Sequence, residues 1–252
     1  MRVSLNIEGQ QYESDMSNPL DISIPLTDAF PQVNAFYAPL FKITPYRSGA
    51  FVGSIAEGSS VNFYNVALNP HGNGTHTECL GHITAGKYYI NEQFRNAFHL
   101  AQLVSVYPIQ LENGDRVIDR FHLEQLWQHT GEDALIIRTL PNDAEKLHKL
   151  YSGTNPPYFT SEAIEFITDA GIHHLLCDLP SVDREEDGGK LAAHKAFWGL
   201  PHRTDRLMNT ITELIYVNDD IKDGFYLLNL QTINIQLDAS PSRPVLYSLR
   251  AL

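Results

Sequence analysis

The segment 69–82 (NPHGNGTHTECLGH) concentrates side chains that can bind metals or carry out catalysis. Five such side chains lie within it: His71, His76, Glu78, Cys79 and His82. Imidazole, carboxylate and thiolate groups are the common protein ligands of zinc and similar metals. The segment therefore predicts a site for a divalent metal, and a polar loop with exposed histidines is the alternative.

The local backbone conformation decides whether these side chains can meet. In a fully extended chain His76 and His82 would lie roughly 20 Å apart, at about 3.3 Å per residue, which is too far to share an ion. The residues Gly72-Asn73-Gly74 form a turn in which positive φ is accessible. If a helix follows this turn, Glu78 and His82 lie on one face at positions i and i+4, with His76 at its entrance.

The elements that must position this segment are strands at both ends of the chain and helices in the middle. Short β-branched and aromatic runs predict strands at 21–25, 61–68, 103–110, 134–138, 172–177, 210–217, 224–229, 232–236 and 245–249. Asp119 can cap a helix from Arg120 to about His129, and Gly171 ends a helix that begins at Thr160 or Ser161. We expect a mixed α/β (α+β) fold with a large mixed β-sheet or open barrel and flanking helices, as one domain over residues 1–252.

The composition excludes several classes of protein. The chain has 252 residues, of which 43% are hydrophobic and 19% charged, so it is globular. Its net charge of −12 is repelled by phosphate backbones, so we expect no nucleic-acid partner. No apolar run approaches the roughly 18 residues of a membrane helix. The N-terminus shows no secretory signal, and two cysteines make no disulfide framework, so we expect a cytoplasmic protein without a membrane partner.

The carboxylate of Glu213 also stands out. If residues 210–217 are extended, Glu213 faces the same side as Ile211, Ile215 and Val217. A carboxylate on an apolar face must be paired or bind a metal. A surface salt bridge is the alternative for this residue.

Several motifs, in this order, resemble the cyclase family of metal-dependent hydrolases, which includes bacterial kynurenine formamidase and isatin hydrolase. The motifs are Asp21-Ile22-Ser23, Gly74-Thr75-His76 with Glu78 and His82, Asp178-Leu179-Pro180-Ser181-Val182-Asp183, His194, and Ile211-Thr212-Glu213-Leu214. Together they span residues 21–217. The sequence departs from the family's pattern at its first histidine, its aspartate and its proline, which are Gly72, Glu78 and Leu80 here.

The resemblance implies a swivelling β/β/α fold and a set of site residues. The implied metal ligands are His76, Glu78, His82 and Glu213, with His71 in place of the histidine missing at Gly72. The implied catalytic residues are His194, as general acid and base, and Glu213; without the resemblance His194 would not be preferred over His202. We assign contacts with the ligands or the substrate to Asn73, Thr75, Cys79 and Asp178, and expect Asp178 to hydrogen-bond a histidine and Asp183 to shape its loop.

The activity that the resemblance implies is metal-dependent hydrolysis of an amide-type C–N bond in a small molecule, such as a formamide, a cyclic imide or a lactam-like ring. One or two divalent ions would be bound, with zinc the first choice and manganese the second. A homo-oligomer, namely a dimer, is implied as well. Five aromatic side chains could line an apolar substrate pocket or simply belong to the core: Phe36, Tyr37, Tyr64, Phe197 and Trp198.

Two other functions stay open at this point. The glycine at position 72 favours a catalytically altered protein that only binds a small molecule. A thiol hydrolase is the other alternative, in which a neighbouring imidazole activates Cys79 without a metal.

Overall fold

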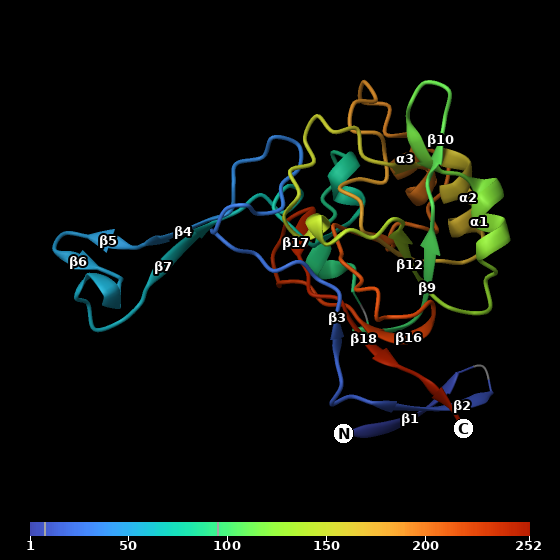
Figure 1. The fold of residues 1–252 in the computed structure, drawn as a ribbon, viewed down its shortest axis with the longest axis horizontal. Coiled ribbons are helices and arrows are strands. Elements are labelled where there is room, and N and C mark those ends of the chain that lie inside the picture. The colour runs from blue at the N-terminus through green and yellow to red at the C-terminus, as the bar shows by residue number, and fades with distance from the viewer. Residues whose placement is uncertain (8, 95) are drawn as a thin grey trace.

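The computed structural model describes residues 1–7, 9–94 and 96–252, and its largest feature is a curled sheet of nine strands (Figure 1). In spatial order the strands are β17 (Ala239–Pro241), β8 (His76–Glu78), β15 (Thr210–Glu213), β14 (His174–Cys177), β12 (Ala134–Thr139), β9 (Phe98–Val106), β16 (Gly224–Asn229), β18 (Val245–Ser248) and β3 (Leu20–Asp21). The four central strands from β15 to β9 are parallel, and the strands on either side are antiparallel to their neighbours. The predicted mixed α/β fold with a large sheet is confirmed.

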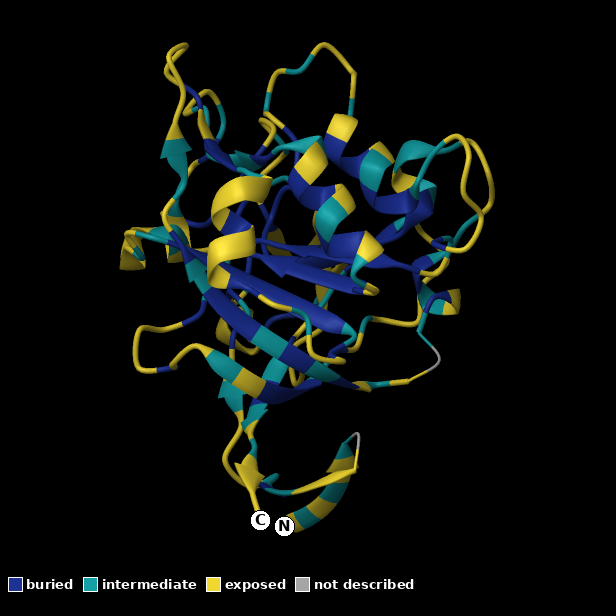
Figure 2. Cartoon of the chain, turned by 90° about the vertical axis from the view of Figure 1, so that its right-hand side faces the viewer, coloured by how far each residue is buried: buried dark blue, intermediate teal, exposed yellow. Residues whose placement is uncertain are grey.

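Helices cover one face of this sheet (Figure 2), and a hydrophobic core cluster lies on each of its faces. They are α1 (Arg120–Leu126), α2 (Ser161–Asp169) and α3 (Ala192–Trp198). Along β12, Leu135 and Ile137 belong to the core cluster beneath the helices, whereas Ala134 and Ile136 belong to the cluster on the opposite face. Because both faces are covered, every residue of β12 is buried, and this accounts for its continuous apolar sequence.

Smaller elements surround the large sheet. The strands β1 (Arg2–Ile7), β2 (Gln10–Asp15) and β19 (Arg250–Ala251) form a sheet at the termini, and another contains β10 (Ile109–Gln110), β11 (Arg116–Ile118) and β13 (Tyr158–Phe159). Short 3₁₀ helices occupy Ile55–Glu57, Leu80–Ile83, Ile90–Glu92 and Ala144–His148. Among the described residues, no helix has the length and apolar character needed to cross a membrane.

A two-stranded arm projects from the body of the molecule (Figure 1). It is formed by residues 42–67, in which β4 (Lys42–Pro45) pairs with β7 (Tyr64–Ala67) and β5 (Arg47–Ser48) pairs with β6 (Phe51–Val52). The strand predicted at 61–68 is therefore present in part, but it lies in this exposed ribbon and not in the core.

Three expectations about elements were wrong. The segment after Gly74 does not form a helix, because His76–Glu78 pairs as strand β8 between β15 and β17, and only Leu80–Ile83 coils, as 3₁₀ helix. The helix α1 ends at Leu126 and not near His129, because Trp127 turns into the core, where its indole donates to Glu132. The segment 232–236 forms no strand; its β-type pairing among the described residues is an isolated bridge between Thr232 and Ser242.

The expected alternation along 210–217 also fails after Glu213. Leu214 has a φ of 53°, so the chain leaves the extended conformation there. As a result Ile211 joins the core cluster beneath the helices, whereas Ile215 and Val217 join the cluster on the other face. Glu213 is nevertheless buried, with 3% of its surface exposed, and so a surface salt bridge is excluded.

Candidate active site

Pairing of β8 with β15 builds the centre of the site. The register places His76 directly opposite Glu213, and His76 Nε2 lies 3.3 Å from Glu213 Oε2. Glu78 follows two residues after His76 and therefore projects from the same face of β8. His76 and Glu78 are completely buried. The strand spacing of two residues thus brings His76 and Glu78 together. Glu78 and His82, expected at i and i+4 of a helix, come within 3.7 Å through the end of β8 and the 3₁₀ helix that follows it.

Two further histidines and an aspartate complete one side of the cluster. His71, in the turn before β8, places Nδ1 3.2 Å from Glu78 Oε2 and Nε2 2.8 Å from Asp238 Oδ2. His82, in the 3₁₀ helix after β8, lies 3.7 Å from Glu78 Oε2 and 3.4 Å from Asp238 Oδ2. Asp238 immediately precedes β17, the strand that pairs with β8 on its other edge.

His194, on α3, approaches the cluster from the helix layer. Its Nε2 lies 3.0 Å from Glu78 Oε1, and its Nδ1 lies 2.6 Å from Asp183 Oδ2. Asp183 also accepts hydrogen bonds from the backbone N–H groups of Ala193 and His194. The aspartate therefore fixes both the first turn of α3 and the orientation of the imidazole, leaving Nε2 directed at Glu78.

Several buried polar atoms at the centre approach one another as ion pairs but make no hydrogen bond of good geometry. They are His76 Nε2, both carboxylate oxygens of Glu78, and His194 Nε2. Burying such atoms without partners is unfavourable, and buried polar groups are normally satisfied. Donor atoms of His71, His76 and Glu78, and likewise of Glu78, His82 and His194, lie within 4.8 Å of one another. These orphaned atoms and this nitrogen- and oxygen-rich donor set fit a divalent metal ion.

The charges of the cluster reinforce one another. Burial opposes the protonated form of His71, but the carboxylates of Asp238 and Glu78 outweigh burial and raise its pKa to about 10. Burial likewise opposes a charged His194, and the charge of Glu78 and the hydrogen bond to Asp183 raise its pKa to about 10. Burial favours a neutral Glu78, but His82 and His194 hold the pKa of this carboxyl well below its usual value. Without a metal the histidines thus supply the positive charge that the carboxylates require.

Three of the four residues expected to contact the ligands or the substrate have other partners. Asn73 accepts a hydrogen bond from the Asn69 backbone and donates to the Pro39 carbonyl. Thr75 donates to the Leu214 carbonyl. Asp178 hydrogen-bonds Thr139 and Lys146, and not a histidine as expected. Asn73, Thr75 and Asp178 therefore support the backbone around the site.

Cys79 is unsuited to act as a nucleophile. Its side chain is completely buried, and Sγ lies 3.4 Å from the Tyr88 carbonyl, to which it donates. Burial raises the pKa of this thiol to about 11. The reactive thiolate is therefore scarce at neutral pH, and the structure gives no support to the thiol-hydrolase alternative.

Sequence reasoning missed two residues of the cluster. Asp238 meets His71 from 167 positions away, and its sequence neighbourhood carries no motif that would single it out. Asp183 shapes its loop, as expected, but it also accepts a hydrogen bond from the imidazole of His194. The prediction that Asp178 makes the hydrogen bond with a histidine was wrong. The clue available for Asp183 was its place at the end of the motif 178–183.

Gly72 explains why the neighbouring His71 belongs to the cluster. A Cβ atom at position 72 would lie 2.3 Å from the Ala38 Cβ and 3.0 Å from the Ala35 carbonyl. The Gly72 carbonyl also accepts a hydrogen bond from the Ala35 N–H. A histidine cannot occupy position 72 in this loop, and the same loop directs the His71 imidazole at Glu78.

The five aromatic residues do not form one substrate pocket. Phe197 and Trp198 are completely buried in the core, where Trp198 stacks on His194 with ring centroids 6.0 Å apart. Phe36, Tyr37 and Tyr64 are all exposed, and Tyr64 lies on the projecting arm. The tryptophan thus packs behind the imidazole, while the exposed aromatics lie outside the core.

Comparison with known proteins identifies the family. The profile of the family described as putative cyclase matches residues 20–184. The chain belongs to this family. Kynurenine formamidase of Bacillus cereus is 26% identical over 193 residues, which cover 75% of this chain and 82% of the relative. The enzyme of the same name from Bacillus cytotoxicus is 26% identical over 196 residues, covering 77% and 83%.

Several solved structures share the fold of this chain at low sequence identity. A predicted metal-dependent hydrolase from Bacillus stearothermophilus superposes with a TM-score of 0.62 and 16% identity, covering 91% of this chain and 98% of that one. Isatin hydrolase A from Labrenzia aggregata, bound to benzyl benzoate, gives a TM-score of 0.62 and 14% identity, covering 91% and 93%. The resemblance found in the sequence motifs is confirmed by the family match and by this common fold.

Proposed function

We propose that this chain is a metal-dependent hydrolase that cleaves an amide-type C–N bond in a small molecule. The observation that carries the proposal is the convergence of buried, unpartnered donor atoms from segments far apart in sequence, as described for His76, Glu78 and His194. The names of the relatives, kynurenine formamidase and isatin hydrolase, support a formamide or a lactam-like ring as the substrate class.

One or two divalent ions would be held by the residues predicted from the sequence, with Asp238 added by the structure: His71, His76, Glu78, His82, Glu213 and Asp238. Zinc suits the nitrogen-rich donor set best, and manganese is the second choice. Such an ion, when bound, polarises a carbonyl group and lowers the pKa of a water molecule.

The protein's own side chains would fix the ligands and move the proton. Glu213 Oε1 accepts a hydrogen bond from the Val182 N–H at 2.9 Å, which leaves Oε2 facing His76. Asp183 holds Nδ1 of His194 as the donor of their hydrogen bond, so Nε2 is the atom free to exchange a proton. His194 would pass this proton to the departing nitrogen as the general acid.

The test combines metal analysis with turnover. Untagged protein is analysed by plasma mass spectrometry and assayed with N-formylkynurenine and with isatin, before and after chelation. We expect bound zinc or manganese, loss of turnover on chelation, and loss of metal in His76→Ala and Glu213→Ala but not in the exposed control His202→Ala. A wild-type protein that neither carries nor takes up zinc or manganese would contradict the mechanism. A metal-loaded protein without turnover on any amide would instead favour the binding-protein alternative, which Gly72 first suggested.

The projecting arm supports the predicted dimer. Its apolar side chains are open to solvent, with Ile55 and Val66 each 56% and Phe63 58% exposed. Apolar ribbons of this kind are commonly buried against a partner. We expect light scattering to give twice the 28.4 kDa chain mass and deletion of the arm to give a monomer. A cytoplasmic location and a single domain over residues 1–252 stay predictions.

A further inference from the structure

A second cluster of metal-binding side chains lies at the opposite end of the central strands. His99 is near the start of β9, Asp133 immediately precedes β12, and His174 is the first residue of β14. These strands are parallel, with Ala134 paired to both Ala101 and His174, so their starting ends meet at one edge of the sheet. Glu213, by contrast, ends β15 and faces the catalytic cluster.

The donor atoms of this second cluster are close together and already oriented. One donor atom from each of His99, Asp133 and His174 can be chosen so that all lie within 4.8 Å of one another. Asp133 Oδ2 lies 2.7 Å from His99 Nδ1, and Thr210 Oγ1 lies 2.8 Å from His174 Nδ1. His174 is thus held through Nδ1, which leaves its Nε2 free as a donor, the arrangement typical of metal-binding histidines. His99 presents Nδ1 itself beside Asp133 Oδ2, so these two atoms are the donors that one ion could share.

Two buried polar atoms beside the same cavity lack partners, and a polar occupant of the cavity, such as water around a bound ion, would satisfy them. His99 is only 5% exposed, and its Nε2 has no hydrogen-bond partner. Gln93 Oε1 is likewise buried and unpartnered, and Gln93 lines the same cavity as His99. Buried polar atoms without partners are rare, so two of them beside one cavity require an explanation.

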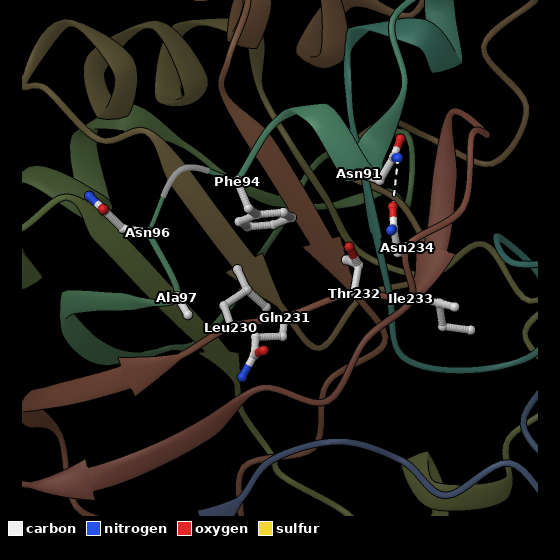
Figure 3. A pocket seen from close by; sticks show the side chains of 9 residues that line it. All are labelled: Asn91, Phe94, Asn96, Ala97, Leu230, Gln231, Thr232, Ile233 and Asn234. Carbon is white, nitrogen blue, oxygen red and sulfur yellow. Dashed lines mark hydrogen bonds between the residues drawn. The ribbon is translucent and has the colours of Figure 1, made fainter.

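The cavity has room for an ion and for water molecules that complete its coordination. Its volume is about 290 Å³, and its lining includes His99, Asp133 and His174. A neighbouring hollow of about 240 Å³ shares Phe94 and Asn96 with it, and its lining includes Asn91 and Asn234, which are joined by a hydrogen bond (Figure 3).

The protonation states favour a cation. Burial and the neighbouring His99 lower the pKa of His174 to about 3, so its imidazole is neutral at physiological pH. Burial opposes ionisation of Asp133, but its hydrogen bond with His99 keeps the pKa of this carboxyl below its usual value.

The Phe94 ring stacks on the imidazole of His174, with ring centroids 5.7 Å apart, and limits the movement of this imidazole.

We propose that His99, Asp133 and His174 form a second site for a divalent ion of the zinc class, separate from the catalytic cluster. Two imidazoles and one carboxylate, with water in the remaining position, are an established donor set for zinc. Since the three ligands come from the starts of three adjacent strands, a bound ion would tie β9, β12 and β14 together and stabilise the sheet.

The test removes the catalytic site and asks whether zinc still binds. In the double variant His76→Ala/Glu213→Ala we expect one equivalent of zinc by calorimetry and a rise in melting temperature on adding zinc. Asp133 is 41% exposed, so Asp133→Asn should fold normally. In the same background this change should weaken zinc binding by about tenfold or more.

A matched control is available at the protein surface. His122 and Asp119 are also 2.7 Å apart, but they are exposed and belong to none of the three-residue clusters found among the described residues. His122→Ala should leave zinc binding unchanged. As a second measure that does not depend on the folding of the double variant, Asp133→Asn in the unaltered chain should lose one equivalent of zinc and keep its catalytic metal. The proposal is overturned if the double variant folds but binds no zinc, or if Asp133→Asn leaves both the affinity and the stoichiometry unchanged.

Discussion

Replacement of Asp183 by asparagine tests how the site controls His194. The aspartate accepts three hydrogen bonds, from the N–H groups of Ala193 and His194 at 2.7 and 3.1 Å and from His194 Nδ1 at 2.6 Å. The carbonyl oxygen of an asparagine can replace Oδ2 and keep both bonds from His194, but its amide nitrogen then faces the Ala193 N–H and cannot accept. The opposite orientation keeps the bond from Ala193 and loses both bonds from His194. In either orientation the neutral amide removes the negative charge that stabilises the imidazolium of His194.

The expected magnitude follows from these contacts. A positioned general acid or base contributes about 10²- to 10⁴-fold to the rate, so kcat should fall by roughly that factor while KM changes little. Loss of a hydrogen bond to a charged group should lower the free energy of unfolding by about 2 kcal/mol. Because Asp183 is one of the groups that raise the pKa of His194, the variant should also lower that pKa.

The assay is the pH dependence of kcat with N-formylkynurenine or isatin, with metal content measured on the same samples. Asp187→Asn is the matched control, because Asp187 lies in the same loop and accepts from the Gly189 and Leu191 N–H groups without contacting His194. Equal losses of kcat in the two variants would show that the loop, and not the orientation of His194, limits the rate. An unchanged kcat in Asp183→Asn with full metal content would refute the reasoning outright.

Three further predictions concern the cluster and the core. Asp238→Ala should weaken metal binding by at least about 10- to 100-fold, since Asp238 is one of the proposed ligands and also contacts His71 and His82. Competition with a chromogenic chelator measures this, and unchanged affinity would remove Asp238 from the site. Cys79→Ser should retain turnover, and thiol reagents should leave the folded enzyme active, because the thiol is buried and its pKa is raised to about 11; a thiol-sensitive enzyme would reverse this conclusion. In metal-free protein the pKa of His71 is about 10, against 6.5 in the unfolded chain, and this difference stabilises the fold. The stabilisation is complete below pH 6.5 and is lost as the pH rises through 10, with a total of no more than about 5 kcal/mol. Urea unfolding at pH 6.5 and at pH 10 measures the loss, which would be absent if the carboxylates did not pair with His71.

Much of the fold could be predicted because local patterns determine it. The continuous apolar run of β12 predicted a buried strand. Thr160 and Gly171 marked the two ends of a helix whose apolar positions pack on the sheet. The exceptions were places where distant contacts override local preference. His76–Glu78 is a strand and not part of a helix because β15 and β17 pair with it from both sides.

The sequence by itself indicated most of the ligands of the catalytic cluster and, through the order of its motifs, the family to which the chain belongs. Only the tertiary structure decided how they meet. It made Asp238 a partner of His71, assigned Asp183 to His194, and brought His99, Asp133 and His174 together at the starts of three strands. The physical reason is that side-chain periodicity acts over a few residues, whereas strand register and loop closure join residues that are from 11 to 167 positions apart in these pairs. The sequence pattern does not encode such pairings locally.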